Sequence, residues 1–314
     1  MKITILGGGS WGTALAVHLA RNGHSINVWE FFEEQAQEMQ VQRKCKLLPE
    51  VILPSNINVY SDMIVALKEV ELVLLVVPSD KVENTIKLAA PLLLDQPIII
   101  CSKGFSADGR LLSSLVQEEV SGKVYCLYGP THAEEVGKGM FSGIVLAGDD
   151  GRKELAKVFL RDDFKVELSD DIIGVQVCAA LKNIFAVFIG VLDGMKLGDN
   201  AKAYVMTQGL KEIQLMGLKM GAHAETFYGL AGVGDLIVTC TSTHSRNRFV
   251  GQEVGKGRKL DEVLAGMSMV AEGVTAVKIA VKLQDKLGLD LSLIYGLYEI
   301  LFEGKDPLSV LKGV

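Results

Sequence analysis

A lysine stands in the middle of one of the most apolar stretches of the chain. Residues 175–192 read VQVCAALKNIFAVFIGVL, and Lys182 and Asn183 interrupt the apolar character in the middle of this stretch. A helix that is apolar almost all round is expected to be buried, and a buried lysine is costly unless it is paired or used. Burial lowers the pKa of an amine, and an amine near neutrality can exchange a proton with an alcohol oxygen. The alternative, a lysine that snorkels to the surface, is disfavoured by the apolar residues on both sides.

A carboxylate in similar surroundings could serve this lysine. Asp235 follows a glycine turn in the segment LAGVGDLIVTCT, residues 230–241, where its neighbours are apolar. We expect Asp235 to orient Lys182 or to balance its charge. The alternative is that Asp235 caps a short helix over Leu236–Thr239.

Groups suited to an anion follow within a few residues. Ser245, Arg246 and Asn247 stand at the expected start of a helix, where hydroxyl, amide and guanidinium donors join unpaired backbone N–H groups. A phosphate or a carboxylate would fit such a site. A solvated helix cap with surface arginines is the alternative.

The N-terminus carries a glycine-rich loop in an informative context. Lys2–Leu6 is expected to be a strand, and it leads into Gly7-Gly8-Gly9-Ser10-Trp11-Gly12 and then a helix. In this G-x-G-x-x-G pattern, Gly7 permits the tight turn, Gly9 lets the backbone approach a pyrophosphate, and Gly12 lets the helix pack against the strand. The helix N-terminus adds amides and a partial positive charge. A glycine-rich turn without a ligand is the less favoured alternative.

An acidic residue ends the second expected strand. Glu30 stands 18 residues beyond Gly12 and is followed by Phe31 and Phe32, not by arginines. A carboxylate there can accept hydrogen bonds from the ribose hydroxyls of adenosine, which favours NAD over NADP. The alternative is that Glu30 merely starts a helix with Glu33 and Glu34.

These groups need a scaffold, and the order of elements predicts an α/β fold. Strands are expected at Lys2–Leu6, Ser25–Trp29, Ile57–Tyr60, Leu72–Val77, Ile98–Ser102, Val124–Tyr128 and Gly143–Ala147, with helices such as Gly12–Asn22 and Glu33–Lys44 between them. Continuous Val/Ile/Leu runs alternating with helices indicate a doubly wound, Rossmann-type parallel sheet. From about Asp170 the pattern becomes all-helical, with helices expected at Asp171–Leu192, Asn200–Met220, Asn247–Lys256, Leu260–Ala265, Thr275–Leu287 and Leu293–Phe302. We therefore expect a dinucleotide-binding domain over residues 1–169 and an all-α substrate-binding and catalytic domain over residues 170–314.

Two loops at the carboxyl ends of expected strands add candidates. Lys103 follows Ile98–Ser102, and Thr131 follows Val124–Tyr128. Ligands of open α/β sheets bind beyond these strand ends, and a second cation near Lys182 would lower its pKa further. The five histidines show no metal-ligand spacing, so we expect no metal site.

Composition excludes several classes of protein. The net charge is −6, whereas a nucleic-acid partner requires a basic surface. The N-terminus does not have the form of a signal peptide, and no run reaches the roughly 18 uncharged apolar residues of a membrane span. Five widely spaced cysteines without C-x-x-C suit free thiols in a reducing cytoplasm. A homodimer is compatible with the sequence.

Seven motifs together resemble those of the bacterial-type NAD(P)-dependent glycerol-3-phosphate dehydrogenases. They are GGGSWGTALA (7–16), CSKGF (101–105), GPTHAEEV (129–136), AALKNIFA (179–186), LAGVGDLIVTC (230–240), SRNRFVG (245–251) and VAEGVTA (270–276). They occur in the family's order across nearly the whole chain. The resemblance implies reversible oxidation of sn-glycerol 3-phosphate to dihydroxyacetone phosphate, which feeds glycerophospholipid synthesis.

The resemblance also implies roles for individual residues. Lys182 matches the catalytic lysine that acts as acid and base at the C2 oxygen, and Asn183 and Thr239 match its polar neighbours. Substrate-binding positions are matched by Lys103, Gly129, Thr131, Asp235, Ser245, Arg246 and Asn247. Cofactor-binding positions are matched by Ser10, Trp11, Lys103, Ala133, Arg246, Val270 and Glu272. Many relatives carry basic residues where this chain has Phe31 and Phe32, so the cofactor is NAD or NADP with NAD favoured.

Two other functions remain open on the residues. A ketopantoate-type or β-hydroxyacid reductase also pairs a Rossmann domain with a helical domain and a lysine, but its substrate carries a carboxylate. A non-catalytic dinucleotide sensor would have no need to bury Lys182, Asn183 and Asp235.

Overall fold

The computed structural model describes residues 1–243, 245–267 and 271–313. Of the predicted site residues, Val270 lies outside this part. The chain forms two compact units, Met1–Ser102 with Leu112–Ile172 (unit 1), and Lys103–Leu111 with Ile173–Val314 (unit 2). The segment Lys103–Leu111 thus belongs to unit 2, although it lies within the sequence range expected for the first domain.

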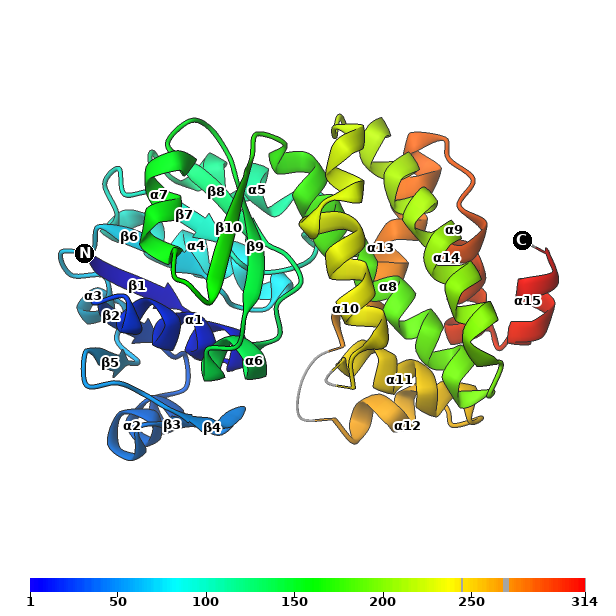
Figure 1. The fold of residues 1–314 in the computed structure, drawn as a ribbon, viewed down its shortest axis with the longest axis horizontal. Helices are drawn as coiled ribbons and strands as arrows, with labels where there is room; N and C mark the ends of the chain where they lie inside the picture. The colour runs from blue at the N-terminus through cyan, green and yellow to red at the C-terminus, as the bar shows by residue number, and fades with distance from the viewer. Residues whose placement is uncertain (244, 268–270, 314) are drawn as a thin grey trace. The chain divides into compact units, whose positions relative to one another are not determined.

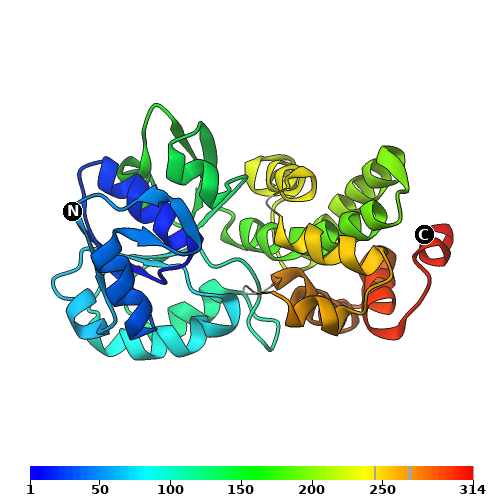
Figure 2. The same ribbon diagram turned by 90° about the horizontal axis from the view of Figure 1, so that it is seen from below.

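Unit 1 is built on an eight-stranded sheet, which confirms the predicted doubly wound architecture (Figure 1). The strands are β1 Lys2–Leu6, β2 Ser25–Trp29, β5 Ile57–Tyr60, β6 Leu72–Leu75, β7 Ile98–Ile100, β8 Val124–Tyr128, β9 Ser142–Ala147 and β10 Phe164–Ser169, in the order β10-β9-β8-β7-β6-β1-β2-β5. Helices lie on both faces of the sheet (Figure 2). Every residue of β6, β7 and β8 is therefore buried, which is why these strands consist of continuous apolar runs.

The sheet differs from the predicted one at its far edge. β9 pairs antiparallel with β8, and β10, which was not predicted, pairs parallel with β9. A short antiparallel hairpin of β3 Lys44–Cys45 and β4 Leu48–Ile52 was also not predicted. The predicted strands Leu72–Val77 and Ile98–Ser102 end two residues earlier, at Leu75 and Ile100. The predicted helix Glu33–Lys44 ends at Gln42, because Arg43 has left-handed backbone angles and Lys44 enters the hairpin.

The helices of unit 1 connect these strands. They are α1 Ser10–Arg21, α2 Glu33–Gln42, α3 Met63–Ala66, α4 Val82–Ala89, α5 Leu112–Glu119, α6 Ala133–Lys138 and α7 Arg152–Phe159. The core includes Ile3 and Ile5 of β1, Ala14 and Leu15 of α1, and Phe159 of α7.

Apart from Lys103–Leu111, unit 2 is all-helical in the part of the chain that the structure describes, as predicted. Its helices are α8 Ile172–Gly194, α9 Gly198–Lys219, α10 Asp235–Thr241, α11 Arg246–Gly255, α12 Leu260–Ala265, α13 Glu272–Leu287, α14 Ser292–Tyr298 and α15 Pro307–Gly313. A π-helical turn, Leu230–Gly234, precedes α10, and another, Glu299–Glu303, replaces the end of the predicted helix Leu293–Phe302.

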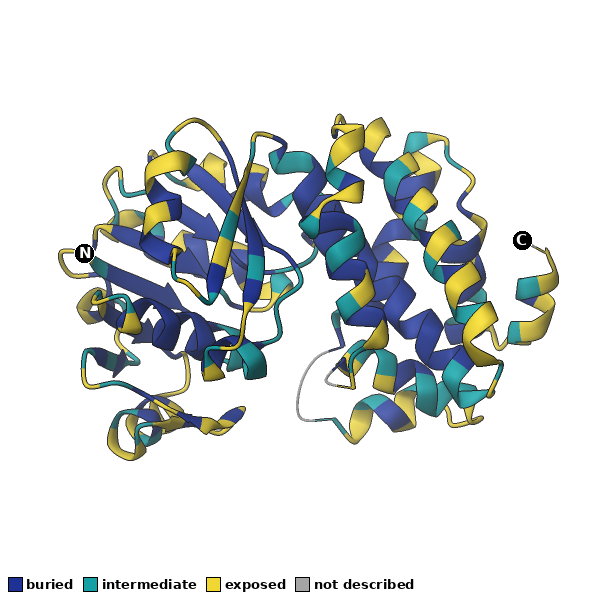
Figure 3. Cartoon of the chain, viewed as in Figure 1, coloured by how far each residue is buried: buried dark blue, intermediate teal, exposed yellow. Residues whose placement is uncertain are grey.

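Helix α8 is the central element of unit 2. It is long and apolar enough to cross a membrane, but 89% of its most apolar window is buried inside the protein (Figure 3). Phe185 and Phe188 of α8 share one core with Phe227 and with Val277 of α13. The apolar composition of α8 is therefore explained by its burial in this core.

Candidate active site

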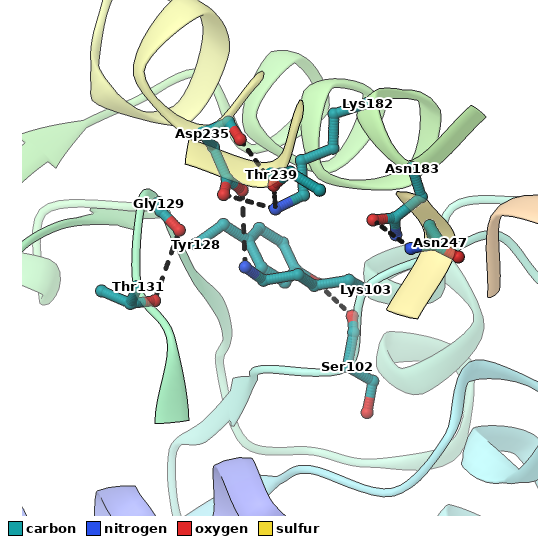
Figure 4. A network of polar contacts seen from close by, with 10 residues as sticks. All are labelled: Ser102, Lys103, Tyr128, Gly129, Thr131, Lys182, Asn183, Asp235, Thr239 and Asn247. Carbon is teal, nitrogen blue, oxygen red and sulfur yellow. Dashed lines mark hydrogen bonds and ion pairs between the residues drawn. The ribbon is translucent and has the colours of Figure 1, made fainter. Parts of the chain in front are cut away.

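The amine of Lys182 lies at the centre of a buried polar network in unit 2 (Figure 4). Lys182 is 4% exposed, and its Nζ donates to Oδ1 of Asp235 and, at 2.9 Å, to Oγ1 of Thr239. The Thr239 hydroxyl donates to the backbone carbonyl of Asp235 at 2.6 Å. That bond uses the hydroxyl proton, so the oxygen faces Lys182 as an acceptor. Lys182 does not snorkel to the surface.

A second amine reaches the same carboxylate. Lys103 Nζ lies 3.4 Å from Oδ2 of Asp235, whose side chain is 1% exposed. Asp235 is the first residue of α10, but Gly234 is the N-cap and no side-chain capping bond forms. The alternative of a capping aspartate is therefore wrong, because the carboxylate accepts from two lysines.

Local structure explains how these residues meet. Asp235 and Thr239 are four residues apart on α10, so their side chains share one face of the helix. The π-helical turn before α10 is a feature that is frequent at functional sites. Lys103 starts a short loop that is closed by a bridge between Phe105 and Leu111, and Phe105 packs in the same core as α8.

The charges around Lys182 act against one another. Burial lowers the pKa of its amine, the Asp235 carboxylate opposes this, and the nearby Lys103 lowers it further, so that the pKa lies at about 7. An amine with this pKa can give and take a proton near neutral pH.

Asn183 and Asn247 form a second contact in unit 2. The Asn247 amide donates to Oδ1 of Asn183 at 2.9 Å, and its own oxygen accepts from the backbone N–H of Gly273 at 2.9 Å. Asn247 thus connects the start of α11 to α8 and to the first turn of α13, which Glu272 begins.

The predicted anion-binding residues stand at the N-terminus of α11. Ser245 is the N-cap, and its hydroxyl oxygen accepts from the backbone N–H of Arg248 at 3.3 Å, as the capping alternative predicts. Arg246 is exposed at the first position of the helix. The cap accounts for the acceptor oxygen of Ser245, and Arg246 adds a positive charge at this helix N-terminus.

Glycines bring α11 against α8 at backbone distance. A Cβ on Gly251 would lie 1.9 Å from the carbonyl oxygen of Val187, and a Cβ on Gly190 would lie 2.0 Å from that of Arg248. Neither separation is sterically possible, so both positions must be glycine for the helices to keep this contact. The register of α11 along α8 is thereby fixed.

The glycine-rich loop of unit 1 has the predicted geometry. Gly7 has a φ of 123°, and a Cβ on Gly12 would lie 1.9 Å from the Gly7 carbonyl oxygen. A Cβ on Gly9, in contrast, would meet no atom within 4 Å. The buried indole Nε1 of Trp11 has no hydrogen-bond partner within the described residues. An open position beside a helix N-terminus, with an N–H in need of an acceptor, fits the phosphates of a dinucleotide.

Glu30 is held against this loop. It is 8% exposed, and its carboxylate accepts from the backbone N–H of Phe32 at 3.2 Å. Burial raises the pKa of Glu30, while hydrogen bonds from the backbone of Phe32, Gly8 and Phe31 oppose the rise. Because α2 begins only at Glu33, the interpretation that Glu30 merely starts this helix is wrong.

Gly8, Phe31 and Phe32 surround Glu30. A Cβ on Gly8 would lie 2.6 Å from Oε2 of Glu30, so a side chain at this position would displace the carboxylate. Phe31 and Phe32 are 66% and 57% exposed and pack edge to face. The sequence did not single out Gly8, because it occupies a variable position of the motif.

The remaining predicted residues of unit 1 follow β8. Thr131 Oγ1 donates to the carbonyl of Gly129 at 3.3 Å, and Ala133 begins α6. Sequence reasoning missed Tyr128, whose hydroxyl donates to the carbonyl of Ser102 at 2.7 Å and so anchors the residue before Lys103. The only sequence signal for Tyr128 was its type and position: a tyrosine, which carries a polar hydroxyl, at the last position of a buried strand. Across the described ranges, no cluster of three or more acidic, histidine or cysteine residues is arranged to hold a metal ion.

A Rossmann-type unit joined to a helical unit with a buried, carboxylate-paired lysine defines a class, the dinucleotide-dependent oxidoreductases. Comparison with known proteins identifies a family within this class. Residues 2–154 match the family described as NAD-dependent glycerol-3-phosphate dehydrogenase N-terminus, and residues 171–312 match the corresponding C-terminus.

Individual relatives agree over the whole chain. The glycerol-3-phosphate dehydrogenase [NAD(P)+] of Prosthecochloris aestuarii is 41% identical over 97% of this chain and 95% of the relative. That of Enterococcus faecalis is 42% identical over 100% of this chain and 95% of the relative. The crystal structure of glycerol-3-phosphate dehydrogenase from Coxiella burnetii superposes with a TM-score of 0.95 at 34% identity, covering 99% of this chain and 98% of that one. The chain therefore belongs to the NAD-dependent glycerol-3-phosphate dehydrogenase family, and it is an enzyme.

The comparison with solved structures also found a ketopantoate-type reductase, which is the alternative considered above. A ketopantoate reductase from Ralstonia eutropha superposes with a TM-score of 0.64 at 16% identity, covering 96% of this chain and 97% of that one. At this identity the likeness shows the fold alone.

Proposed function

We propose that this enzyme interconverts sn-glycerol 3-phosphate and dihydroxyacetone phosphate with NAD as its preferred cofactor. The proposal includes a cytoplasmic location, a homodimer and a supply of glycerol 3-phosphate to glycerophospholipid synthesis. The observation that carries it is the buried amine of Lys182, held by Asp235 and Thr239 with Lys103 beside it. The names of the relatives supply the substrate.

Lys182 is the proposed acid and base. In its ammonium form it has three N–H groups, of which one faces Asp235 and one faces Thr239. The third can donate to the ketone oxygen of dihydroxyacetone phosphate. In reduction the proton moves from Nζ to this oxygen as the C2 carbon gains a hydride, and in oxidation Nζ takes the proton back.

Asp235, Thr239 and Lys103 support this transfer. Asp235 and Thr239 hold the amine in one position, which reduces the cost of orienting it. The positive charge of Lys103 stabilises the negative charge that develops on the ketone oxygen during the transfer. Asn183 accepts a hydrogen bond from Asn247. We propose that this bond positions Asn247 for substrate binding.

The phosphate of the substrate is assigned to Ser245, Arg246 and Asn247. The N-terminus of α11 provides a partial positive charge, and the exposed guanidinium of Arg246 provides a fork of donors. Gly129 and Thr131 are proposed to contribute from unit 1. Holding the phosphate positions the carbonyl for reaction.

Unit 1 is proposed to hold the dinucleotide. When bound, the nicotinamide supplies or accepts the hydride. The loop residues Gly7, Gly9, Ser10, Trp11 and Gly12 would hold the pyrophosphate, with Ala133 in unit 1 and with Lys103, Arg246, Val270 and Glu272 as further cofactor-binding positions. Glu30, fixed by three backbone N–H groups, would accept from the ribose hydroxyls and repel a 2′-phosphate.

A spectrophotometric assay tests the proposal. Purified enzyme should oxidise NADH in the presence of dihydroxyacetone phosphate, with a higher kcat/KM for NADH than for NADPH. Turnover of 2-ketopantoate but not of dihydroxyacetone phosphate would refute the substrate, and NADH binding without consumption would refute catalysis. A higher kcat/KM for NADPH would refute the assigned role of Glu30.

The phosphate assignment has its own test. Arg246→Ala should raise the KM for dihydroxyacetone phosphate more than the KM for NADH. Arg258→Ala is a matched control, because Arg258 pairs with Glu253 at the surface of the same unit. Equal increases in both KM values in Arg246→Ala would show that this residue is not the phosphate ligand.

A further inference from the structure

Arg248 is a charged residue of unit 2 to which the proposed mechanism assigns no role. Its Nε donates to Oδ2 of Asp193 at 2.6 Å, and its Nη1 donates to the backbone carbonyls of Thr241 at 2.7 Å and Ser242 at 3.4 Å. One side chain therefore joins the end of α10 to α8. Its backbone N–H also donates to the Ser245 hydroxyl at 3.3 Å.

Asp193, the acceptor of the Arg248 hydrogen bond, lies on the same helix as Lys182. It stands eleven residues after Lys182 on α8, which is about three helical turns, so the two side chains project from nearly the same face. Its side chain is 13% exposed and also contacts Lys202 of α9 at 3.1 Å. Burial opposes ionisation of Asp193, but the hydrogen bonds from Arg248 and Lys202 outweigh it, and the pKa of Asp193 lies below its usual value.

The backbone of Arg248 is fixed by the same helix. Gly190 of α8 leaves just enough room for the Arg248 carbonyl, and Gly251 on the next turn of α11 lies against the Val187 carbonyl. Asn247 adds its hydrogen bond to Asn183. The N-terminus of α11 is thus fixed to α8 on both sides of Arg248.

We propose that Arg248 and Asp193 are positioning residues that hold Ser245, Arg246 and Asn247 in the orientation that binds the substrate phosphate. The pair fixes this segment to the helix that carries Lys182, so that the distance between the phosphate-binding segment and the Lys182 amine is set within unit 2. This inference rests on the function proposed above. Arg248 itself acts through Ser245–Asn247 and need not contact the substrate.

The test compares substrates with and without the phosphate. Arg248→Met should lower the ratio of kcat/KM for dihydroxyacetone phosphate to kcat/KM for dihydroxyacetone by about 10- to 100-fold, the size expected for a misplaced binding group. Asp193→Asn should act in the same direction, and Arg248→Lys should restore part of the ratio because it keeps the charge toward Asp193. The matched control Arg258→Met should leave the ratio unchanged.

A second arm separates positioning from general damage to the fold. Introduced into Arg246→Ala, which already lacks the main phosphate ligand, Arg248→Met should lower the ratio little further, because residues that act through one another are not additive. A thermal unfolding curve accompanies each variant. If Arg248→Met fails to fold, Arg248→Lys and Asp193→Asn provide the same comparison.

The outcomes are distinguishable. Equal losses on both substrates, or full additivity with Arg246→Ala, would overturn the positioning role and leave the proposed function standing. A wild-type enzyme that does not turn over dihydroxyacetone phosphate would overturn both.

Discussion

His18 in unit 1 and Lys182 in unit 2 are both bases removed from water, but their partners differ. His18 is 4% exposed, its Nε2 lies 2.7 Å from the carbonyl oxygen of Phe159, and its ring packs against Phe164. Burial lowers the pKa of His18 to about 4, against a smaller opposing effect of the Phe159 hydrogen bond. Lys182 is equally buried but faces the carboxylate of Asp235 and the amine of Lys103.

The difference shows what tunes a buried base. A neutral carbonyl is too weak a partner to keep His18 charged, so His18 is a neutral structural group at physiological pH. A carboxylate offsets part of the desolvation of Lys182, and a neighbouring amine limits that offset. The pKa of Lys182 consequently lies near neutral pH, where a proton can move in either direction.

The largest expected effect comes from removing Lys182, the proposed acid and base. Lys182→Ala should lower kcat for dihydroxyacetone phosphate by roughly 10²- to 10⁴-fold, the usual contribution of general acid catalysis. Steady-state kinetics at saturating NADH measure it. Normal turnover in this variant would remove Lys182 from the chemistry and end the contrast with His18.

His18 should instead affect stability. Its folded pKa of about 4 lies below the unfolded value of about 6.5, so the unfolded chain takes up a proton first as the pH falls. Stability should therefore drop between pH 6.5 and 4, by roughly 3 kcal/mol in total. In His18→Gln this pH dependence should be absent from urea unfolding curves, whereas it should persist in the half-buried control His24→Gln.

Two glycines, one in each unit, extend the comparison of the two units from side chains to the backbone. Gly251→Ala would force α11 away from α8 and should reduce stability by about 1–3 kcal/mol, visible as a lower Tm. Gly9→Ala meets no atom within 4 Å, so Tm should stay unchanged while NADH binding, measured by fluorescence titration, weakens. A lower Tm for Gly9→Ala would mean that the space beside this loop serves the fold.

The smallest effect is a displacement of a pH profile. The rate of ketone reduction should fall as the pH rises through the pKa of Lys182, because the ammonium form is the acid in the proposed mechanism. Lys103→Met removes a like charge and raises that pKa, so the falling limb should move to higher pH, whereas Asp235→Asn should move it to lower pH. Movement of both variants in one direction would contradict the assigned balance of charges.

Strong local signals made much of the fold and of the glycine-rich loop predictable from the sequence. The buried strands of unit 1 and helix α8 consist of continuous apolar runs, and the glycine loop stands between β1 and α1 as its spacing implies. β10 escaped prediction because it is an edge strand with mixed burial, and its sequence FKVELS lacks a continuous apolar run. The direction of β9 was also missed, because strand periodicity carries no information about orientation.

Contacts between distant residues were only partly predictable. The isolated Asp235 and the buried Lys182 suggested a pair, since an unpaired charge in such surroundings is costly. That Asp235 also accepts from Lys103, and that Arg248 reaches Asp193, depends on packing between separate helices and loops. No local pattern encodes such packing.

The loop Lys103–Leu111 means that unit 2 is not encoded by one uninterrupted stretch of gene. A fragment starting at residue 173 would keep Lys182 and Asp235 but lose the second amine, which the chain supplies from between β7 and α5. A chimera of two homologues joined at this point would pair Lys103 from one parent with the Lys182–Asp235 couple of the other. Recombination at this junction therefore exchanges one of the three charged groups of the candidate site, Lys103, together with the Rossmann-type unit.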